Sequence, residues 1–256
     1  MSTQILAIAN QKGGVAKTTT VASLGAALAE QGSSVLIVDL DPQACLTFSL
    51  GIDPEDLELS VHHVLTKGVD PTEVILETAD GVDLLPATIE LARAEADLLT
   101  RTGREYVLRA ALEDLDGYDW VLLDCPPSLG VLTVAALTAA GAVLIPLQCE
   151  TLSHRGVGQL LDTVHDVRRF TNKGLAVWGV LPTLYDGRTN HARAVLETIS
   201  ETYDLEVIEP PIPKSIRFAE APAAGRSILA TARRTRGADA YRAVALNLTE
   251  RAGRGA

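Results

Sequence analysis

The sequence predicts an α/β fold in which a doubly wound, mostly parallel sheet carries helices on both faces. Short β-rich apolar runs alternate along the chain with longer segments of helical period, the succession that builds parallel sheets. The runs are apolar throughout, which is typical of strands buried on both faces. The 256 residues, 47% hydrophobic and 21% charged, have the composition of a globular protein, and we expect residues 1–256 to form a single domain.

The expected strands follow from the positions of these runs, for example VLIV at 35–38 and WVLL at 120–123. We expect strands at residues 5–9, 35–40, 82–85, 120–123, 142–146 and 177–181, with a seventh around Val207 and helices between them. The most apolar window, residues 131–147, is shorter than the roughly 20 residues that span a membrane. Gly141 and Pro146 divide it into a helix and a strand, so we interpret it as buried core.

The charge balance is acidic overall but uneven along the chain. The 22 Lys and Arg residues against 33 Asp and Glu residues give a net charge of −11, which argues against a uniformly basic nucleic-acid coat. Residues 1–150 carry 7 basic and 22 acidic side chains, whereas residues 151–256 carry 15 and 11. The C-terminal part is therefore where we expect an anionic partner to dock.

The cysteines and the N-terminus indicate the compartment. Cys45, Cys125 and Cys149 form no CxxC pair, so neither a disulfide framework nor a zinc site is indicated. The N-terminus has no basic segment followed by a long apolar one, as a signal peptide would. These features favour a reducing cytoplasm.

A glycine-rich loop with lysines directly follows the first expected strand. It reads Lys12-Gly13-Gly14-Val15-Ala16-Lys17-Thr18-Thr19, and a stretch of helical character comes next. Glycines let backbone N–H groups turn toward phosphates, Lys17 supplies a point charge to the β- and γ-oxygens, and the Thr18 hydroxyl can ligate Mg²⁺. The alternative, a glycine-rich turn with incidental lysines, does not explain why strand and helix flank the motif. We therefore expect these eight residues to bind a nucleotide.

Carboxylates follow two further expected strands. Asp39 and Asp41 are two apart on an extended segment, so they are expected on the same side at the carboxyl edge of the sheet. Asp124 ends the apolar run 120–123, as a Walker B aspartate does near the hydration shell of a metal. For Asp41 the alternative is an Asp-Pro turn that only caps the next helix.

The loop departs from the general pattern G-x-x-x-x-G-K-[ST], because Gln11 and Ala16 stand where its glycines would be. The second lysine, Lys12, makes the loop resemble the deviant Walker A motif, KGGxxK[TS], of the ParA/MinD superfamily of P-loop ATPases. The resemblance implies that Lys12 reaches the phosphates of the other subunit in a nucleotide-sandwich dimer, in the manner of an arginine finger. Family members usually carry glycine at the position of Ala16. If the loop needs a positive φ there, alanine is strained by about 1 kcal/mol.

The other motifs resemble the same family. Asp39 to Gln43 resembles its DxDPQ switch I, which implies that Asp41 positions the attacking water and contacts Mg²⁺ through water, and Asp124-Cys125-Pro126 resembles its switch II. The implied catalytic residues are Lys12, Lys17, Asp41 and Asp124, with Thr18, Asp41 and Asp124 around the metal. Segments at Pro182 and Pro213 resemble those that bracket the adenine. Because no N-K-x-D guanine signature occurs, ATP is favoured, with Mg²⁺.

The resemblance covers residues 4 to about 245 and is strongest to the short Soj-type chromosome-partitioning ATPases, which lack an operator-binding N-terminal domain. It implies an ATP-dependent homodimer on non-specific double-stranded DNA, a ParB-like partner that stimulates hydrolysis and release, and a place in the cytoplasm at the nucleoid. Arg188 and Arg217 match two arginines of the Soj DNA surface, and we add Lys214 and Arg226 as candidates for phosphate contacts. Chromosome and plasmid both remain open as cargo.

Four other classes compete with this interpretation. A MinD-like membrane-cycling or other cargo-positioning ATPase needs a C-terminal amphipathic helix with bulky apolar residues, but residues 240–248 are rich in alanine, so we expect no membrane partner. An iron–sulfur reductase needs further cysteines, and a P-loop tyrosine kinase needs clustered C-terminal tyrosines. A nucleotide switch with negligible hydrolysis stays open because of Ala16, and an ATPase assay with and without the partner distinguishes it.

Overall fold

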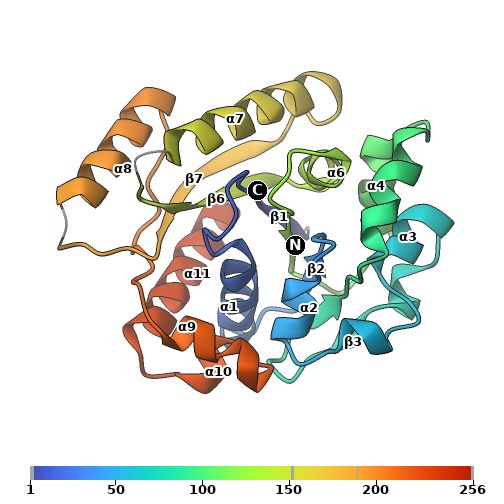
Figure 1. The fold of residues 1–256 in the computed structure, drawn as a ribbon, viewed down its shortest axis with the longest axis horizontal. Coiled ribbons are helices and arrows are strands. Elements are labelled where there is room, and N and C mark those ends of the chain that lie inside the picture. The colour runs from blue at the N-terminus through green and yellow to red at the C-terminus, as the bar shows by residue number, and fades with distance from the viewer. Residues whose placement is uncertain (1–2, 151–152, 189, 255–256) are drawn as a thin grey trace.

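A seven-stranded sheet forms the centre of the computed structural model, which describes residues 3–150, 153–188 and 190–254 (Figure 1). The strands run in the spatial order β3-β4-β2-β5-β1-β6-β7, and every neighbouring pair is parallel except β3 with β4. Their bounds are β1 Gln4–Ile8, β2 Val35–Asp39, β3 Leu76–Glu77, β4 Asp83–Leu85, β5 Trp120–Asp124, β6 Ala142–Gln148 and β7 Ala176–Thr183.

Helices cover both faces of the sheet (Figure 1). One face carries α1 Lys17–Glu30, α2 Cys45–Ser49, α10 Ile228–Thr231 and α11 Arg236–Arg254. The other carries α3 Val61–Lys67, α4 Leu91–Leu99, α5 Val107–Glu113, α6 Val131–Ala139, α7 Ser153–Phe170 and α8 Asn190–Tyr203. The short helices η1 Pro54–Asp56, η2 Pro71–Glu73, η3 Arg104–Tyr106, α9 Arg217–Glu220 and η4 Pro222–Ala224 lie in the connections.

Successive strand residues serve opposite faces of the sheet, because side chains alternate along a strand. In β1, Leu6 and Ile8 join the core under α1 and α11, whereas Ala7 joins the core under α3 to α8, and all three are fully buried. Burial on both faces explains why the strand sequences are continuously apolar. The predicted fold class, a doubly wound and mostly parallel sheet, is confirmed.

The prediction of a seventh strand around Val207 is wrong. Val207 makes only an isolated parallel bridge with Val180. Pro210 and Pro211 follow, and because proline has no N–H group a ladder cannot continue through them. The seventh strand is β3, two residues long and antiparallel to β4, which was not among the expected strands.

The apolar window 131–147 folds as α6 and β6 within the core, as expected. Among the residues that the structure describes, no helix combines the length and the apolar character needed to cross a membrane.

Candidate nucleotide-binding site

The strand order brings the three sequence motifs to one edge of the sheet. β5 lies between β2 and β1, and in register Asp124 pairs with Asp39 on one side and with Ile8 on the other. The loop after β1, the aspartates after β2 and the aspartate that ends β5 therefore meet at neighbouring carboxyl ends. In open α/β sheets this edge is where ligands bind.

Buried polar side chains fasten the loop of residues 10–16 from beneath. Asn10 donates through Nδ2 to the Pro146 carbonyl at 2.7 Å, and its Oδ1 accepts from the Lys12 amide at 3.0 Å. Thr183, at the end of β7, donates its hydroxyl to the Val15 carbonyl at 2.9 Å. Asn10 and Thr183 are almost fully buried, so the loop is anchored to β6 and β7. Sequence reasoning missed both residues; the only signal was a polar residue at the end of an apolar run.

The exposed top of the loop has room for a ligand. A Cβ added at Gly13 or Gly14 would meet no atom within 4 Å, and Gly14 has a φ of 74°, in the region that favours glycine. Behind them, Ala16 caps α1 with φ 65° and ψ 35°, so the positive φ that would strain an alanine is present. The first N–H groups of α1 lie directly after it, at the helix end where phosphate groups bind.

Lys17 is buried at the base of the loop. Its Nζ donates to the Lys12 carbonyl at 3.2 Å, and the residue is only 7% exposed. Burial lowers the pKa of Lys17, while the nearby carboxylates of Asp124 and Asp41 raise it. A phosphate entering the loop would supply a further counter-charge to this ammonium.

The Asp124 carboxylate is buried without a hydrogen-bond partner of ordinary geometry among the described residues. Burial raises its pKa well above the usual range, as does the charge of Asp39, whereas Thr18 and Lys17 lower it. A buried carboxylate without partners is costly, so this one fits a cation that completes its environment. Mg²⁺ takes few protein ligands beside phosphates and waters, so a single buried carboxylate with the neighbouring Thr18 hydroxyl suits it.

The two switch aspartates differ in where their carboxylates lie. Asp41 is partly exposed, and its Oδ1 accepts from the Gln43 amide at 2.9 Å. Asp39 is fully buried, and its carboxylate accepts from the backbone and hydroxyl of Thr47 and from the Asp41 amide. The two carboxylates, which we expected on the same side, therefore have different surroundings: Asp41 is partly exposed, whereas Asp39 is buried and bonded to Thr47 of α2.

Lys12 is ion-paired with Glu150, which follows β6. Both side chains are partly exposed, at 34% and 52%. Glu150 was not among the residues that sequence reasoning selected, because it lies far from the loop in the chain. In the single chain, therefore, Lys12 is paired with a carboxylate. The family resemblance assigns this same lysine to the phosphates of the partner subunit.

The two proline segments expected around the base lie side by side. The Ile212 amide donates to the Pro182 carbonyl at 2.7 Å, and the Tyr185 amide donates to the Ile212 carbonyl at 2.9 Å. Because the Thr183 hydroxyl reaches Val15, these segments also border the loop. The structure thus brings Pro182 and Pro213 together at the edge that holds the phosphate motif.

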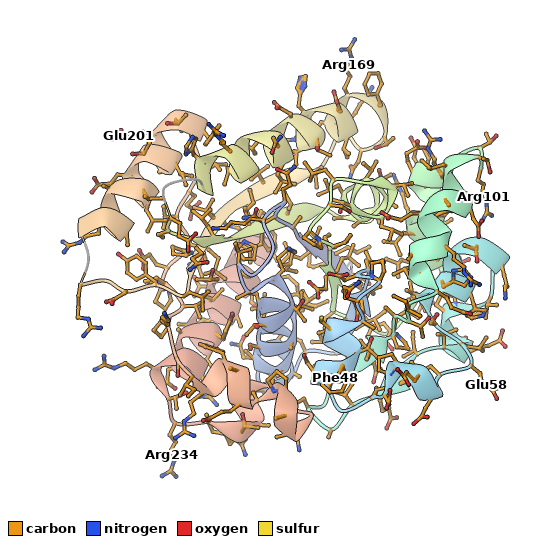
Figure 2. All side chains as sticks on the ribbon, in the orientation of Figure 1. Phe48, Glu58, Arg101, Arg169, Glu201 and Arg234 are labelled. Atoms are coloured by element: carbon orange, nitrogen blue, oxygen red, sulfur yellow. The ribbon has the colours of Figure 1, made fainter. Side chains whose placement is uncertain are left out.

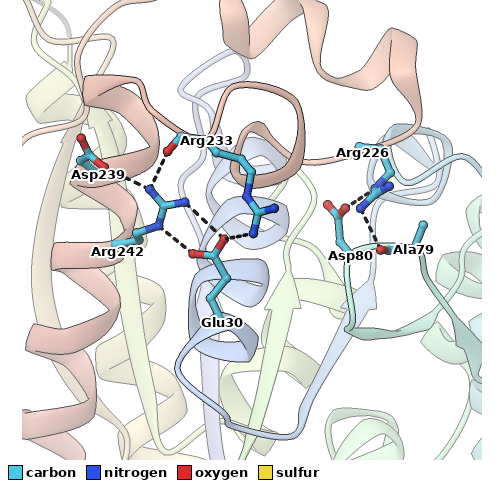
Figure 3. Close-up of polar contacts among 7 residues, drawn as sticks. All are labelled: Glu30, Ala79, Asp80, Arg226, Arg233, Asp239 and Arg242. Carbon is cyan, nitrogen blue, oxygen red and sulfur yellow. Dashed lines mark hydrogen bonds and ion pairs between the residues drawn. The ribbon is translucent and has the colours of Figure 1, made fainter.

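The four cations selected for DNA contacts differ in how they are engaged. The Arg188 side chain is 91% exposed and pairs with Asp186, and Arg217, 58% exposed, pairs with Glu220. Lys214 is exposed. Arg226, in contrast, is bound by the buried carboxylate of Asp80 and donates to the Ala79 carbonyl at 2.9 Å, as Figure 3 shows.

Comparison with known proteins agrees with the motifs. A family model described as an AAA domain matches residues 3–177. The chain is 45% identical over 240 residues to the sporulation initiation inhibitor protein Soj of Bacillus subtilis, covering 93% of this chain and 95% of that protein. It is likewise 45% identical over 240 residues to the chromosome-partitioning ATPase Soj of Thermus thermophilus, covering 94% and 93%. The chain belongs to the ParA/Soj family of P-loop ATPases.

A solved structure related to this ParA/Soj-family chain carries a different description. It is described as cobyrinic acid a,c-diamide synthase from Mycobacterium smegmatis with bound ADP and magnesium. It is 55% identical, with a TM-score of 0.90, and the match covers 100% of this chain and 97% of that one. A second structure of the same protein holds an ATP analog and magnesium.

Proposed function

We propose that this ParA/Soj-family chain is an ATP-dependent DNA-partitioning ATPase of one domain. Its ATP-bound sandwich dimer holds non-specific double-stranded DNA at the nucleoid, and a ParB-like protein stimulates hydrolysis and release, which moves a chromosome or plasmid. The observation that carries the proposal is the buried carboxylate of Asp124, which has no hydrogen-bond partner of ordinary geometry among the described residues, beside a loop with two lysines. That arrangement is built for a nucleotide with a metal ion, and Lys12 is the part that acts across a dimer.

ATP and Mg²⁺ are the ligands that this site takes. The M. smegmatis relative holds ADP or an ATP analog with magnesium. Bound Mg²⁺ neutralises charge on the phosphates. On this chain Thr18 and Asp124 would hold it, with Asp41 in contact through water, and the orphaned Asp124 oxygens are the feature that such an ion satisfies.

The chain's own residues divide the work of hydrolysis. Residues 13 to 19 bind the phosphates through backbone N–H groups, and Lys17 binds the β- and γ-oxygens from beneath. Asp41, partly exposed at the same edge, orients the attacking water. Lys12 exchanges Glu150 for the phosphates held by the second subunit, where its charge favours the developing negative charge.

The proposed DNA surface lies in the C-terminal part. An open groove of about 880 Å³ is lined by cations from three segments, together with two acids, and includes Tyr185, Asp186, Arg188, Lys214, Arg236 and Asp239. Asp186 is bonded by Arg188 and Asp239 by Arg242, so both acids already have basic partners. Phosphate contacts need only a few such cations, and binding through them falls steeply with salt. Arg226 is expected to contribute least, because its guanidinium would first have to leave Asp80.

The direct test of the proposed cycle is Asp41→Ala. We expect this variant to bind ATP and to remain on DNA as a trapped dimer, because the water is no longer oriented while the phosphate loop is intact. Steady-state ATPase assays with DNA and the partner protein, together with sedimentation on DNA, measure both effects. Lys12→Gln serves as the matched variant: its stimulated turnover falls, with ATP affinity largely kept. Turnover of Asp41→Ala equal to that of the wild type would refute the assignment of Asp41.

A second candidate function is ATP-dependent amide synthesis, because the M. smegmatis relative is described as a diamide synthase. Glutamine-dependent amidation uses a cysteine activated as a thiolate. Burial raises the pKa of each of the three cysteines, that of Cys149 to about 11, so none is poised as a thiolate. An assay for ATP consumption that depends on cobyrinic acid and on ammonia or glutamine decides this candidate.

A further inference from the structure

We propose that Asp39 is a positioning residue for ATP hydrolysis: through Thr47 it fastens α2, and it thereby fixes Asp41 at the edge of the sheet. This inference rests on the proposed ATPase function and names a residue that the catalytic set does not contain. The Asp39 carboxylate accepts three hydrogen bonds, from the Thr47 amide at 2.9 Å, the Thr47 hydroxyl at 2.8 Å and the Asp41 amide at 3.1 Å. All three donors belong to the segment that carries the water-orienting side chain.

The helix that Asp39 holds has little stability of its own. α2 spans five residues, and its N-cap, Ala44, has a φ of 51° and makes no side-chain capping bond. A single helical turn is marginally stable in water, because the entropy lost in forming the first turn exceeds the free energy gained from its hydrogen bonds. Leu46 of α2 and Leu50, its C-cap, are buried, and the bonds that Thr47 donates to Asp39 fix the orientation of α2 on that apolar contact.

The backbone of Asp41 is held on both sides by this arrangement. Its N–H group donates to Asp39, and its carbonyl accepts from the Ala44 amide at 2.9 Å. Its own carboxylate accepts from the Gln43 amide. The direction of the Asp41 side chain is therefore set by Asp39 at one end and by the start of α2 at the other. A shift of about 1 Å in a water-orienting group is enough to lower a rate substantially.

The Thr47 hydroxyl extends the tether to the neighbouring strand. It donates to Asp39 and accepts from the Ala87 amide at 3.0 Å, and Thr47 is fully buried. One hydroxyl thus joins the ends of β2 and β4 to α2. Thr47→Val keeps the shape of the side chain and removes both of these bonds, whereas Thr47→Ser keeps the hydroxyl.

The experiment compares full-length variants in two measurements, kcat and KM for ATP and amide hydrogen exchange of residues 43–52. The matched control is Thr138→Val on α6. It removes an equally buried hydroxyl, which is hydrogen-bonded to the Thr171 hydroxyl at 2.8 Å. We expect Thr47→Val to lower kcat about tenfold with KM changed less than about twofold, and to accelerate exchange in residues 43–52. Thr47→Ser should restore kcat to within about twofold of the wild type, and Thr138→Val should leave it unchanged.

Wild-type kcat in Thr47→Val, an equal loss in Thr47→Ser, or an equal loss in Thr138→Val would overturn the proposal. Hydrogen exchange distinguishes failure of the positioning proposal from failure of the proposed ATPase function. If the wild type hydrolyses no ATP, the positioning role falls with the proposed function. Faster exchange in Thr47→Val would then still establish the tether itself, and unchanged exchange would remove that as well.

Discussion

Ala16, at the centre of the site, has a strained left-handed backbone. Its φ is 65°, in a region that is unfavourable for alanine. Its place in the phosphate loop explains why the strain persists, since the loop has to turn into α1 at that residue. Asn10 and Thr183 hold the part of the loop that precedes Ala16 by buried hydrogen bonds to Lys12 and Val15. Sequence comparison identified the position of Ala16, whereas the bonds that enforce the turn appear only in the fold.

Ala16→Gly should therefore be neutral or stabilising by up to about 1 kcal/mol, because relief of the left-handed strain offsets the added entropy of the unfolded chain. Ala29→Gly is the control. It makes the same change inside α1, where glycine costs roughly 1 kcal/mol. Urea denaturation of the two variants measures the difference. Equal destabilisation would mean that the turn at Ala16 is not strained.

Asp124 lends itself to a test of the metal site without any assay of activity. Asp124→Asn should raise the melting temperature of the ligand-free protein, because it removes a buried carboxylate that has a raised pKa and no hydrogen bond of ordinary geometry among the described residues. The same change should abolish the additional stabilisation that MgATP gives over ATP with a chelator. Asp97→Asn, at an exposed position, is the control and should keep that response. A full Mg²⁺ response in Asp124→Asn would contradict the assignment.

The sequence predicts the parts of the site that belong to local motifs, but not the contacts between residues far apart in the chain. Lys17, Thr18 and Asp124 belong to short motifs that follow strands, so their meeting at one edge follows from parallel topology. The Lys12 pair with Glu150 joins residues 138 positions apart, and no local pattern announces it. The Asp39 side chain points inward because α2 packs beside it. The apolar pattern of a strand gives no information on where that helix packs.

The turn that follows α2 contacts the segment that follows η4 directly through the backbone, with no side chain between them. Gly51 ends the turn after α2 with φ 83°, and Gly225 follows η4 with φ 62°. A Cβ on Gly225 would lie 2.8 Å from the Gly51 Cα, so the two backbones are in direct contact. The segment that carries Arg217 therefore lies against the same switch helix that Asp39 holds.

Gly225→Ala should destabilise the protein by about 1–2 kcal/mol more than Gly68→Ala. Both glycines have similar positive φ values, 62° and 69°, but a Cβ on Gly68 meets nothing within 4 Å. The pair therefore separates the cost of the backbone conformation from the cost of the clash with Gly51. Chemical denaturation gives both values, and equal losses would show that the contact between the two backbones is loose.

An ion-pair cluster joins the C-terminal end of α1 to the N-terminal half of α11, as Figure 3 shows. Glu30 accepts from Arg242 at 2.7 Å and 3.2 Å and lies 3.7 Å from Arg233. The hydrogen bond from Arg242 lowers the pKa of Glu30. Because Glu30 ends α1, where the helix dipole disfavours a carboxylate, the arginines offset an unfavourable position.

The lowered pKa of Glu30 predicts a pH dependence with a definite sign. Its stabilising contribution is present above the unfolded value of about 4.3 and is lost as the pH falls through the folded value. Glu30→Gln should cost about 0.5–1 kcal/mol at pH 7, modest because the pair is partly exposed, and progressively less below pH 4. Denaturation across this range is compared with Glu113→Gln, an exposed control. A constant difference between wild type and Glu30→Gln would rule out the pair.

At the level of elements, the sequence predicted most of the sheet. Six apolar runs became strands within a residue or two of their expected bounds, because burial on both faces leaves a continuous apolar signature. The exceptions have local causes. Prolines stop the ladder near Val207, and β3 is an edge strand too short to carry a pattern.

Charge is divided along the chain between the nucleotide site and the proposed DNA surface. The acidic residues 1–150 contain the nucleotide loop, whereas the more basic residues 151–256 contain the groove and the proposed DNA contacts. Among the cations of that part, the structure separates those engaged between elements, such as Arg226 and Arg242, from those that project outward, such as Arg234 in Figure 2. Sequence gave the charge count, and only the fold shows which cations are available.

The central claim, that the nucleotide site controls a DNA-binding form, is tested most directly by one measurement. Binding of the protein to non-specific duplex DNA is measured at low salt without nucleotide, with ADP, with ATP and with a slowly hydrolysed ATP analogue. The account predicts binding only with the triphosphates, weakening steeply as salt rises. Absence of binding in every state, or equal binding in all of them, would contradict it and would turn the search to protein partners or membranes.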